Sequence, residues 1–212
     1  MNRIKNELQH IIIGDGQTGV ASQLKKTQIF LRRNAQASGH SKPEKSFKRQ
    51  EEAGLKRFAG RQNLFYNGPV SENNFIARGA EQRVYRFDDF HVFKLNESIF
   101  YESWLDYFNN LLIHNYFFKS TAYEFLGFVV ENNTLNAVVK QEFVTDAFPA
   151  DLQVVKRFLE FNGFMNVRRN DYVNEELGLI FEDLHDENVL SKDGMLYFID
   201  TIFYLTEKFY ST

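Results

Sequence analysis

Cysteine is absent from this chain, and proline occurs only three times in 212 residues. Without cysteine there is no disulfide framework, no thiolate nucleophile and no Cys-ligated zinc site. Hydrophobic runs are also short, and none approaches the ~18 residues that a membrane span needs. We therefore expect neither a signal peptide nor a membrane partner, and we expect a cytoplasmic protein.

Net charge is only −3, but the two signs are unevenly distributed along the chain. Residues 1–64 hold 13 Lys/Arg and 5 Asp/Glu, whereas the remainder holds 12 and 23. One interpretation is a basic helical segment that docks on an acidic body. Another is contact with nucleic acid or a different acidic partner. The segment lacks the interleaved aromatic and basic residues that stack bases, which weakens the nucleic-acid interpretation.

Apolar spacing in the first 64 residues is helical. It predicts helices over residues 1–13 and 19–36, and a third that runs from a Ser46 cap to Gln62. The turn Gly14-Asp15-Gly16-x-x-Gly19 resembles a dinucleotide-binding fingerprint. No hydrophobic strand longer than three residues leads into it, so we interpret it as a turn between helices.

From residue 74 the pattern changes to short strands separated by turn residues. A helix is expected over residues 97–118 and another from Asp151 to about Phe161. Strands are expected over residues 74–79, 83–87, 91–96, 124–131, 134–144, 189–191 and 195–200, with tight turns at Asp88-Asp89, Asn132-Asn133 and Asp193-Gly194. Because the strands come in hairpins and not in βαβ units, this order predicts an α+β fold.

Lys94, in the third predicted strand, is a candidate phosphate ligand. If Phe93 and Leu95 face the core, Lys94 faces the opposite side. A solvated face is the ordinary explanation for such a lysine. Its place fifteen residues after Gly79 favours phosphate contact instead, with the Gly79-Ala80 turn and Val84 closing over the nucleotide.

Three polar residues near the C-terminus suit magnesium and phosphoryl chemistry. Asp183 and Asn188 lie five residues apart in a predicted loop, and Asp200 ends the following hairpin strand. In such a site the first Asp orients the acceptor hydroxyl, while the Asn and the second Asp hold Mg²⁺. Any one of them alone is more simply a turn or cap residue. His185 is interpreted as a residue that stabilises the loop rather than as a zinc ligand.

Other positions follow from the order of the elements. Glu102 and Asp106 lie one turn apart on the predicted helix, so either can orient Lys94, and Glu102 has the longer reach. Glu142 and Val144 leave the fifth strand where backbone groups can bind adenine.

Several motifs resemble a known family. The catalytic-loop segment Asp183–Leu190 with Phe198-Ile199-Asp200 resembles the aminoglycoside and choline phosphotransferase branch of the protein-kinase-like superfamily. More closely, residues 50–205 resemble the kinase domain of polyvalent proteins from phages and conjugative elements. The segments that carry this likeness are His114–Phe118 with Thr121-Ala122-Tyr123 and Gly127-Phe128, Gln141-x-Phe143-Val144, and Glu182–Leu190.

The resemblance implies a compact two-lobed kinase fold that binds ATP and Mg²⁺ through Lys94, Asp183, Asn188 and Asp200. We expect a basic helical segment over residues 1–64 and a minimal kinase-like domain over 65–212. Its N-lobe, about 72–144, would hold five antiparallel strands and one helix. Its C-lobe, about 145–212, would be reduced and mainly helical.

Some positions depart from the kinase pattern. Phe181 stands where kinases usually carry His, the glycine turn has a single Gly, and twelve residues follow Asp200, which is too few for an activation segment. The four polar residues Lys94, Asp183, Asn188 and Asp200 still predict a phosphotransferase that acts on a small-molecule or protein hydroxyl. The alternatives are a catalytically weak pseudokinase or nucleotide-binding module, and a nucleic-acid adaptor built on the basic segment.

Overall fold

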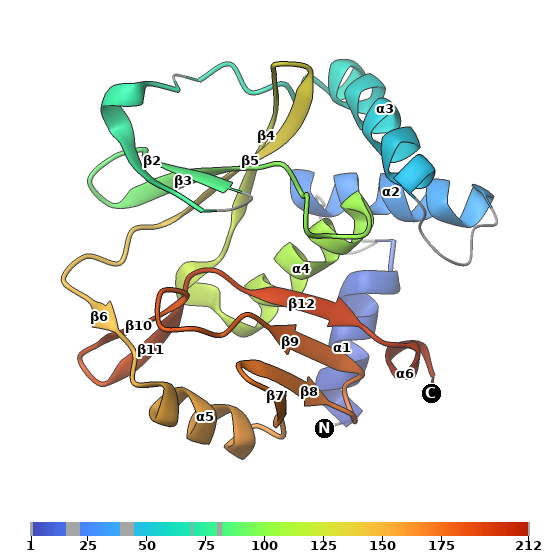
Figure 1. Ribbon diagram of the computed structural model, residues 1–212. Coiled ribbons are helices and arrows are strands. Elements are labelled where there is room, and N and C mark those ends of the chain that lie inside the picture. The colour runs from blue at the N-terminus through green and yellow to red at the C-terminus, as the bar shows by residue number, and fades with distance from the viewer. Residues whose placement is uncertain (1, 16–21, 39–44, 69, 80–81, 212) are drawn as a thin grey trace. The chain divides into compact units, whose positions relative to one another are not determined.

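The computed structural model describes residues 2–15, 22–38, 45–68, 70–79 and 82–211 (Figure 1). Contacts divide the chain into two units. Unit 1 comprises Met1–Asp15, Asn109–Ala122 and Val144–Thr212, and unit 2 comprises Gly16–Phe108 and Tyr123–Phe143. The domain boundaries inferred from the sequence stay a prediction. Among the described residues, no helix combines the length and the apolar character needed to cross a bilayer.

Unit 2 is built on one antiparallel sheet of five strands. Its spatial order is β1-β2-β3-β5-β4, as the predicted N-lobe requires. The strands are β1 (Phe75–Arg78), β2 (Gln82–Arg86), β3 (His91–Asn96), β4 (Glu124–Glu131) and β5 (Thr134–Glu142), with a 3₁₀ turn η1 (Glu72–Asn74) before them. Asn132 and Asn133 join β4 to β5 with φ of 48° and 66°. A two-residue turn with both residues left-handed matches the strand twist, so the predicted hairpin is confirmed.

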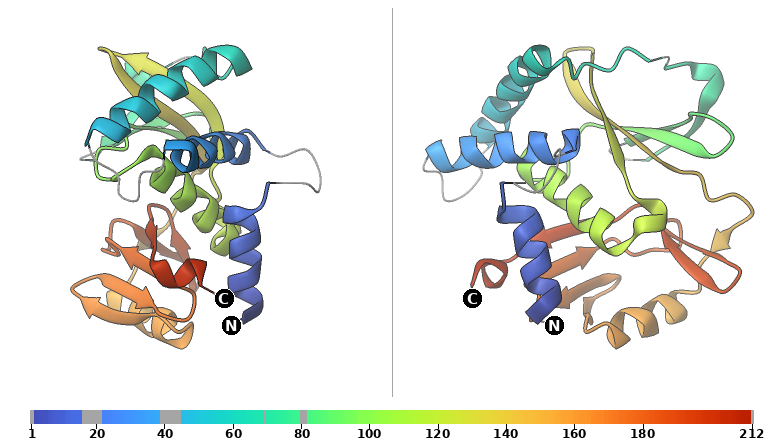
Figure 2. Two further views of the ribbon diagram at one scale, coloured as in Figure 1. Left: turned by 90° about the vertical axis from the view of Figure 1, so that its right-hand side faces the viewer. Right: turned by 180° about the vertical axis from the view of Figure 1, so that it is seen from behind.

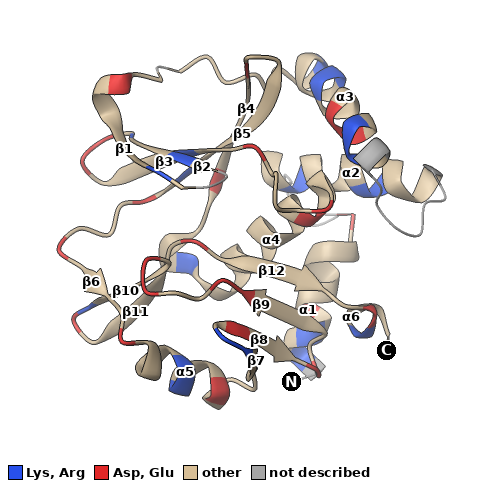
Figure 3. Cartoon of the chain, viewed as in Figure 1, with Lys and Arg blue, Asp and Glu red and all other residues tan. Residues whose placement is uncertain are grey.

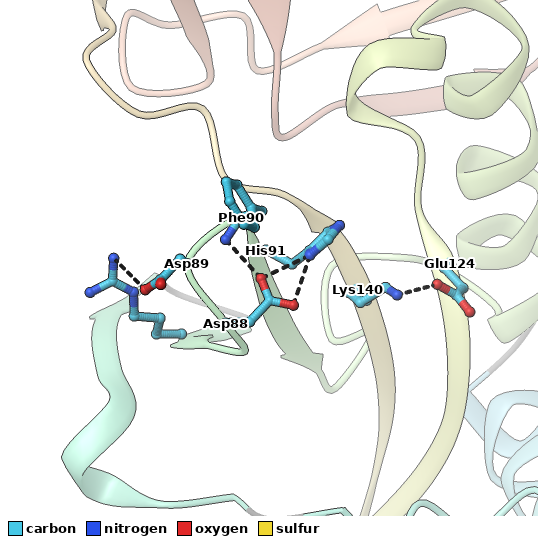
Figure 4. A network of polar contacts seen from close by, with 7 residues as sticks. Asp88, Asp89, Phe90, His91, Glu124 and Lys140 are labelled. Carbon is cyan, nitrogen blue, oxygen red and sulfur yellow. Dashed lines mark hydrogen bonds and ion pairs between the residues drawn. The ribbon is translucent and has the colours of Figure 1, made fainter.

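The turn between β2 and β3 is held by side chains (Figure 4). The Asp88 carboxylate accepts the backbone N–H of Phe90 at 2.7 Å and lies 2.9 Å from His91 Nδ1. Close by, Lys140 of β5 and Glu124 of β4 form an ion pair at 2.6 Å. The predicted turn at Asp88-Asp89 is confirmed, and it fixes the start of β3.

One face of this sheet carries a hydrophobic cluster. Tyr85, Phe93, Leu95 and Val138 are its buried members, and the Tyr85 and Phe93 rings are stacked 5.1 Å apart. Because side chains alternate along a strand, Lys94 faces the other side of the sheet, as predicted.

Helix α4 (Trp104–Phe117) begins seven residues later than the predicted start at Glu97. The Asn96 side chain accepts the N–H of Ser98 at 2.6 Å, and Ser98 has φ of 57°, which no helix allows. The Ser103 hydroxyl accepts the N–H of Asp106 at 3.0 Å, so Ser103 is the cap. The predicted helical start was therefore wrong, because local side-chain bonds turn the chain first.

Helices α2 (Gln23–Ser38) and α3 (Lys45–Gln62) complete unit 2. They meet through the Phe30 and Phe58 rings, which are stacked 4.4 Å apart. Helix α3 ends at Gln62 as predicted, but Ser46 lies inside it and is not its cap. Lys and Arg residues, coloured blue in Figure 3, recur along the described parts of both helices. The predicted start of the second helix at 19 and most of the preceding glycine turn lie outside the described residues.

In unit 1, the described part of residues 145–212 holds more strand than helix, so the expected mainly helical C-lobe is wrong. One sheet has the order β12-β9-β8-β7 and a second has β11-β10-β6. The strands are β6 (Phe148–Pro149), β7 (Met165–Arg168), β8 (Asp171–Asn174), β9 (Leu179–Glu182), β10 (Val189–Lys192), β11 (Met195–Phe198) and β12 (Ile202–Leu205). Besides α1 (Asn2–Ile13), the helical elements are α5 (Leu152–Phe161), α6 (Glu207–Tyr210), the 3₁₀ turn η2 (Lys119–Thr121) and the second part of α4.

Two predicted features of unit 1 are confirmed. Asp193 and Gly194, with φ of 52° and 76°, form the turn between β10 and β11. The helix predicted to run to about Phe161 is α5, and Asp151 caps it by accepting the N–H of Gln153 at 2.8 Å.

Helix α1 (Asn2–Ile13) packs within unit 1, next to α6 (Figure 2). It buries Leu8 and Ile12, which are 0% and 1% exposed. The Gln9 side chain donates to the backbone carbonyl of Phe209 at 2.6 Å. The Tyr116 hydroxyl of α4 donates to Glu7 at the same distance. The first predicted helix is thus part of the core of this unit.

Candidate functional site

Lys94 is buried, with only 4% of its surface exposed. On β3 it lies directly across from Val84 of β2 and Val139 of β5, so these three side chains share one face of the sheet. The ammonium lies 5.5 Å from the centre of the Tyr123 ring. A solvated face is therefore excluded as the explanation of Lys94. The structure also brings two of the predicted nucleotide-binding residues, Val84 and Lys94, side by side.

The start of α4 packs on the same face. The Phe108 ring meets Phe125 edge-on at 5.1 Å, and Phe125 pairs across strands with Val139, which neighbours Lys94. Helix α4 therefore shapes the surroundings of Lys94.

The two carboxylates predicted to orient Lys94 do not lie one turn apart on a helix. Glu102 precedes α4 and is exposed, so its predicted helical position is wrong. Asp106 is on the helix, but its carboxylate accepts the Ser103 hydroxyl at 2.6 Å. Burial raises the pKa of Asp106, and the nearby charge of Glu102 adds to the effect. The pairing of either carboxylate with Lys94 stays a prediction.

The turn between β1 and β2 is only partly described. The Gly79 N–H donates to the Gln82 carbonyl at 2.9 Å, so it is used within the turn. Among the described residues, a Cβ at Gly79 would meet nothing closer than 3.8 Å, so these neighbours leave room for a side chain. Ala80 lies outside the described residues. Backbone donors for a phosphate would thus have to come from beyond Gly79.

The end of β5 has an open hydrogen-bonding edge. The Phe143 N–H donates to the Phe90 carbonyl at 2.7 Å, and His91 pairs with Glu142. Bonding alternates along an antiparallel pair, so the backbone groups of Glu142 point away from β3. On that side β4 begins only at Glu124, opposite Lys140. Among the described strands, the C=O of Glu142 therefore has no partner in β4.

In unit 1, Asp183 and Asn188 are joined by hydrogen bonds. The Asn188 amide nitrogen donates to the Asp183 backbone carbonyl at 2.8 Å and lies 3.3 Å from its carboxylate. Asp183 has φ of 61°, and 54% of its side chain is exposed, whereas Asn188 is only 8% exposed. Because the nitrogen faces the loop, the amide oxygen of Asn188 is turned away from it, where it can act as a ligand.

Asp200 lies at the same end of the β10–β11 hairpin as Asn188. Val189 pairs with Phe198, and the Ile199 N–H donates to the Asn188 carbonyl at 3.0 Å. Asp200 follows Ile199, so it lies at the open end of the hairpin, away from the Asp193-Gly194 turn. Strand β11 ends at Phe198, so the prediction that Asp200 ends this strand was wrong by two residues.

Asp183 and Asp200 offer carboxylates and Asn188 offers an amide oxygen. Oxygen donors of these kinds suit Mg²⁺. Among the described residues, no group of three or more His, Cys, Asp or Glu side chains is arranged to hold a metal, so the amide is needed. Burial raises the pKa of the neighbouring Glu182, and the charges of Asp171 and Asp183 add to it. This accumulated negative charge favours a cation.

His185 holds the loop together, in keeping with its predicted role. Its Nδ1 lies 3.3 Å from the backbone nitrogen of Glu187, and its Nε2 lies 3.0 Å from the Asn188 amide nitrogen; the neutral ring accepts a hydrogen from one of the two. The carbonyl of His185 also accepts the Asn188 N–H at 3.0 Å.

Sequence reasoning assigned no role to two buried polar side chains. His114 of α4 is hydrogen-bonded to Thr201, the residue after Asp200. Glu51 of α3 accepts the backbone N–H of Trp104 at the start of α4. The available signal was a charged or polar residue on the apolar face of a predicted helix, a pattern that many satisfied core residues share.

A model of one protein family matches residues 48–207 of the chain. Its description is "Serine/Threonine/Tyrosine Kinase found in polyvalent proteins". Comparison with curated proteins gave no match, and comparison with solved structures gave none either.

Proposed function

Because the chain belongs to the family of serine/threonine/tyrosine kinases found in polyvalent proteins, we propose that it transfers a phosphoryl group from ATP, with Mg²⁺, to a hydroxyl. Membership confirms the resemblance seen in the sequence and agrees with the kinase-like α+β fold. The acceptor is a hydroxyl of a small molecule or of a protein.

The observation that carries the proposal is the arrangement of Asn188 and Asp200. The hairpin register places them at one end, and the hydrogen bond to Asp183 turns the Asn188 amide oxygen outward. ATP with Mg²⁺, when bound, supplies the phosphoryl group and offsets its negative charge. Asn188 and Asp200 would hold the metal, and Lys94 would bind phosphate oxygens.

Asp183 is the residue that would orient the acceptor. Its exposed carboxylate can accept a hydrogen bond from a hydroxyl and take the proton as the hydroxyl oxygen attacks. The adenine would be read by the Glu142 carbonyl and the Val144 N–H at the open edge of β5, and Val84 would cover the ring. Glu102 is the proposed partner of Lys94, with Asp106 as the alternative.

A nucleotide-binding module without turnover is the second candidate. Phe181 favours it, because its ring is buried in the core and cannot form the polar contact of the usual His. An adaptor for nucleic acid or another acidic partner is favoured only by the basic residues of α2 and α3 (Figure 3).

Nucleotide binding is tested by melting temperature with ATP and Mg²⁺. At a ligand concentration of about 100 Kd, the folded state gains ~2.7 kcal/mol, so a rise of several degrees is expected. Asp200→Ala should lose most of this rise. If no nucleotide changes the melting temperature of the wild type, both nucleotide-based proposals are refuted.

Turnover separates the enzyme from the binding module. Asp183→Asn should lower ATP turnover at least 100-fold while leaving nucleotide binding nearly unchanged. The matched control is Asp186→Asn, which removes an exposed carboxylate from the same loop and should keep the wild-type rate. Equal turnover in Asp183→Asn and wild type would exclude the proposed role of Asp183. Binding without turnover in the wild type would establish the module.

A further inference from the structure

A fully buried histidine of α4 is hydrogen-bonded on both sides. His114 is 0% exposed, and its Nε2 lies 2.7 Å from the backbone carbonyl of Thr121. Its Nδ1 lies 2.8 Å from the Thr201 hydroxyl. A carbonyl can only accept, so in the neutral ring Nε2 carries the proton and Nδ1 accepts the hydrogen of Thr201. This arrangement fixes both the tautomer and the ring orientation.

Two neighbouring side chains, those of Thr121 and Asn110, form hydrogen bonds with the backbone before and after Asp200. On the preceding side, the Thr121 hydroxyl donates to the carbonyl of Phe198 at 2.7 Å. On the following side, the Asn110 side chain accepts the N–H of Phe203 at 2.9 Å. Asn110 and His114 are four residues apart on α4 and therefore lie on one face of the helix. All of these groups belong to unit 1.

Asp200 itself lies between two strands. Strand β11 ends at Phe198 and β12 begins at Ile202, so no regular ladder spans the residues between them. Besides the backbone hydrogen bond from Ile199 to Asn188, side-chain bonds from Thr121 and Asn110 hold the chain on the two sides of Asp200. Thr201 is 1% exposed, and its hydroxyl points to His114.

From this geometry we propose that His114, through Thr201, is a positioning residue that directs the Asp200 carboxylate toward the metal. The inference rests on the proposed function, since it assumes that Asp200 holds Mg²⁺. His114 would not touch the metal or the nucleotide. Residues that orient a ligand in this way typically change metal affinity 10–100-fold when they are replaced, as an order of magnitude.

The decisive variants differ by one group. Thr201→Val removes the hydroxyl at similar volume, whereas Thr201→Ser keeps it. Binding of Mn²⁺ in the presence of saturating ATP, followed by electron paramagnetic resonance, gives the metal affinity directly. We expect the dissociation constant to rise about 10-fold in Thr201→Val and to stay within about twofold of wild type in Thr201→Ser.

A second variant guards against a folding defect in the first. His114→Gln keeps a donor near the Nε2 position for Thr121 but has no acceptor at Nδ1, so the same loss of affinity is expected. Thr27→Val is the matched control. Thr27 is also 0% exposed, and its hydroxyl donates to the Gln23 carbonyl within α2 at 2.9 Å. We expect Thr27→Val to lower the free energy of unfolding about as much as Thr201→Val does, without changing the Mn²⁺ affinity.

The outcomes separate this inference from the function on which it rests. If the wild type binds Mn²⁺ with ATP, and folded Thr201→Val or His114→Gln binds it equally well, the positioning role is refuted while the proposed function stands. If Thr27→Val weakens metal binding as much as Thr201→Val, the effect is general destabilisation, and the positioning role is again refuted. If the wild type binds no Mn²⁺ with ATP, the proposed function fails and the inference fails with it.

Discussion

Replacement of Glu51 by Gln should change how the stability of the protein depends on pH. Glu51 lies on α3 with 5% of its surface exposed, and one carboxylate oxygen accepts the Trp104 N–H at 2.8 Å. The other oxygen has no hydrogen-bond partner among the described residues. Burial raises the pKa of Glu51 from 4.5 to about 7, outweighing the N–H groups of Trp104 and Leu105 that favour the charged form.

The magnitude and its sign follow from this pKa. The folded protein binds the Glu51 proton more tightly than the unfolded chain does, so the group stabilises the fold most below pH ~4.5. That contribution is lost as pH rises toward ~7. A shift of about 2.5 units corresponds to about 3 kcal/mol of unfolding free energy. Glu51→Gln cannot titrate and should lack this loss.

Urea unfolding of both proteins between pH 4.5 and 8 measures the effect. The wild type should lose about 3 kcal/mol relative to Glu51→Gln across this range, whatever constant offset the new amide introduces. Glu52→Gln is the control, because its carboxylate forms a half-buried pair with Lys56 one turn along the same helix. We expect less than ~0.5 kcal/mol of change there. Parallel pH profiles for wild type and Glu51→Gln would refute the reasoning.

Two further predictions concern stability. Phe181→Ala should cost about 3–5 kcal/mol in urea unfolding, because the ring is 1% exposed and stacked on Phe203 at 4.0 Å; a cost below ~1 kcal/mol would contradict this packing. Asn133→Gly should leave stability unchanged or raise it slightly, whereas Asn133→Ala should lower it by about 1 kcal/mol, because φ is 66° at this turn position. Equal melting temperatures for the two Asn133 variants would contradict the turn assignment.

The parts of the fold that sequence reasoning found depend on local signals. The hairpins at Asn132-Asn133 and Asp193-Gly194 were predictable because residues that tolerate positive φ lie between alternating strands. The face of the sheet on which Lys94 lies was predictable from its place between Phe93 and Leu95, although its burial was not. In each case the deciding interaction is close in sequence.

The parts that it missed depend on distant contacts or on individual side chains. Strand β12 pairs with β9 across the whole loop that contains Asp183 and Asn188, and nothing local indicates this partner. The helix expected from Glu97 fails because one side chain, Asn96, captures the Ser98 N–H. The role of His114 depends on a hydroxyl 87 residues away, which no periodicity can reveal.

Helix α1 lies outside the part of the chain that matches the kinase family, yet it buries Leu8 and Ile12 and holds the backbone of α6 through Gln9. The segment that is recognisable by homology is therefore smaller than the segment that folds. A gene fragment trimmed to the family match would expose apolar surface that α1 now covers, and we expect it to aggregate. A fragment that keeps the family match therefore also has to keep this helix, or replace the apolar surface that the helix supplies.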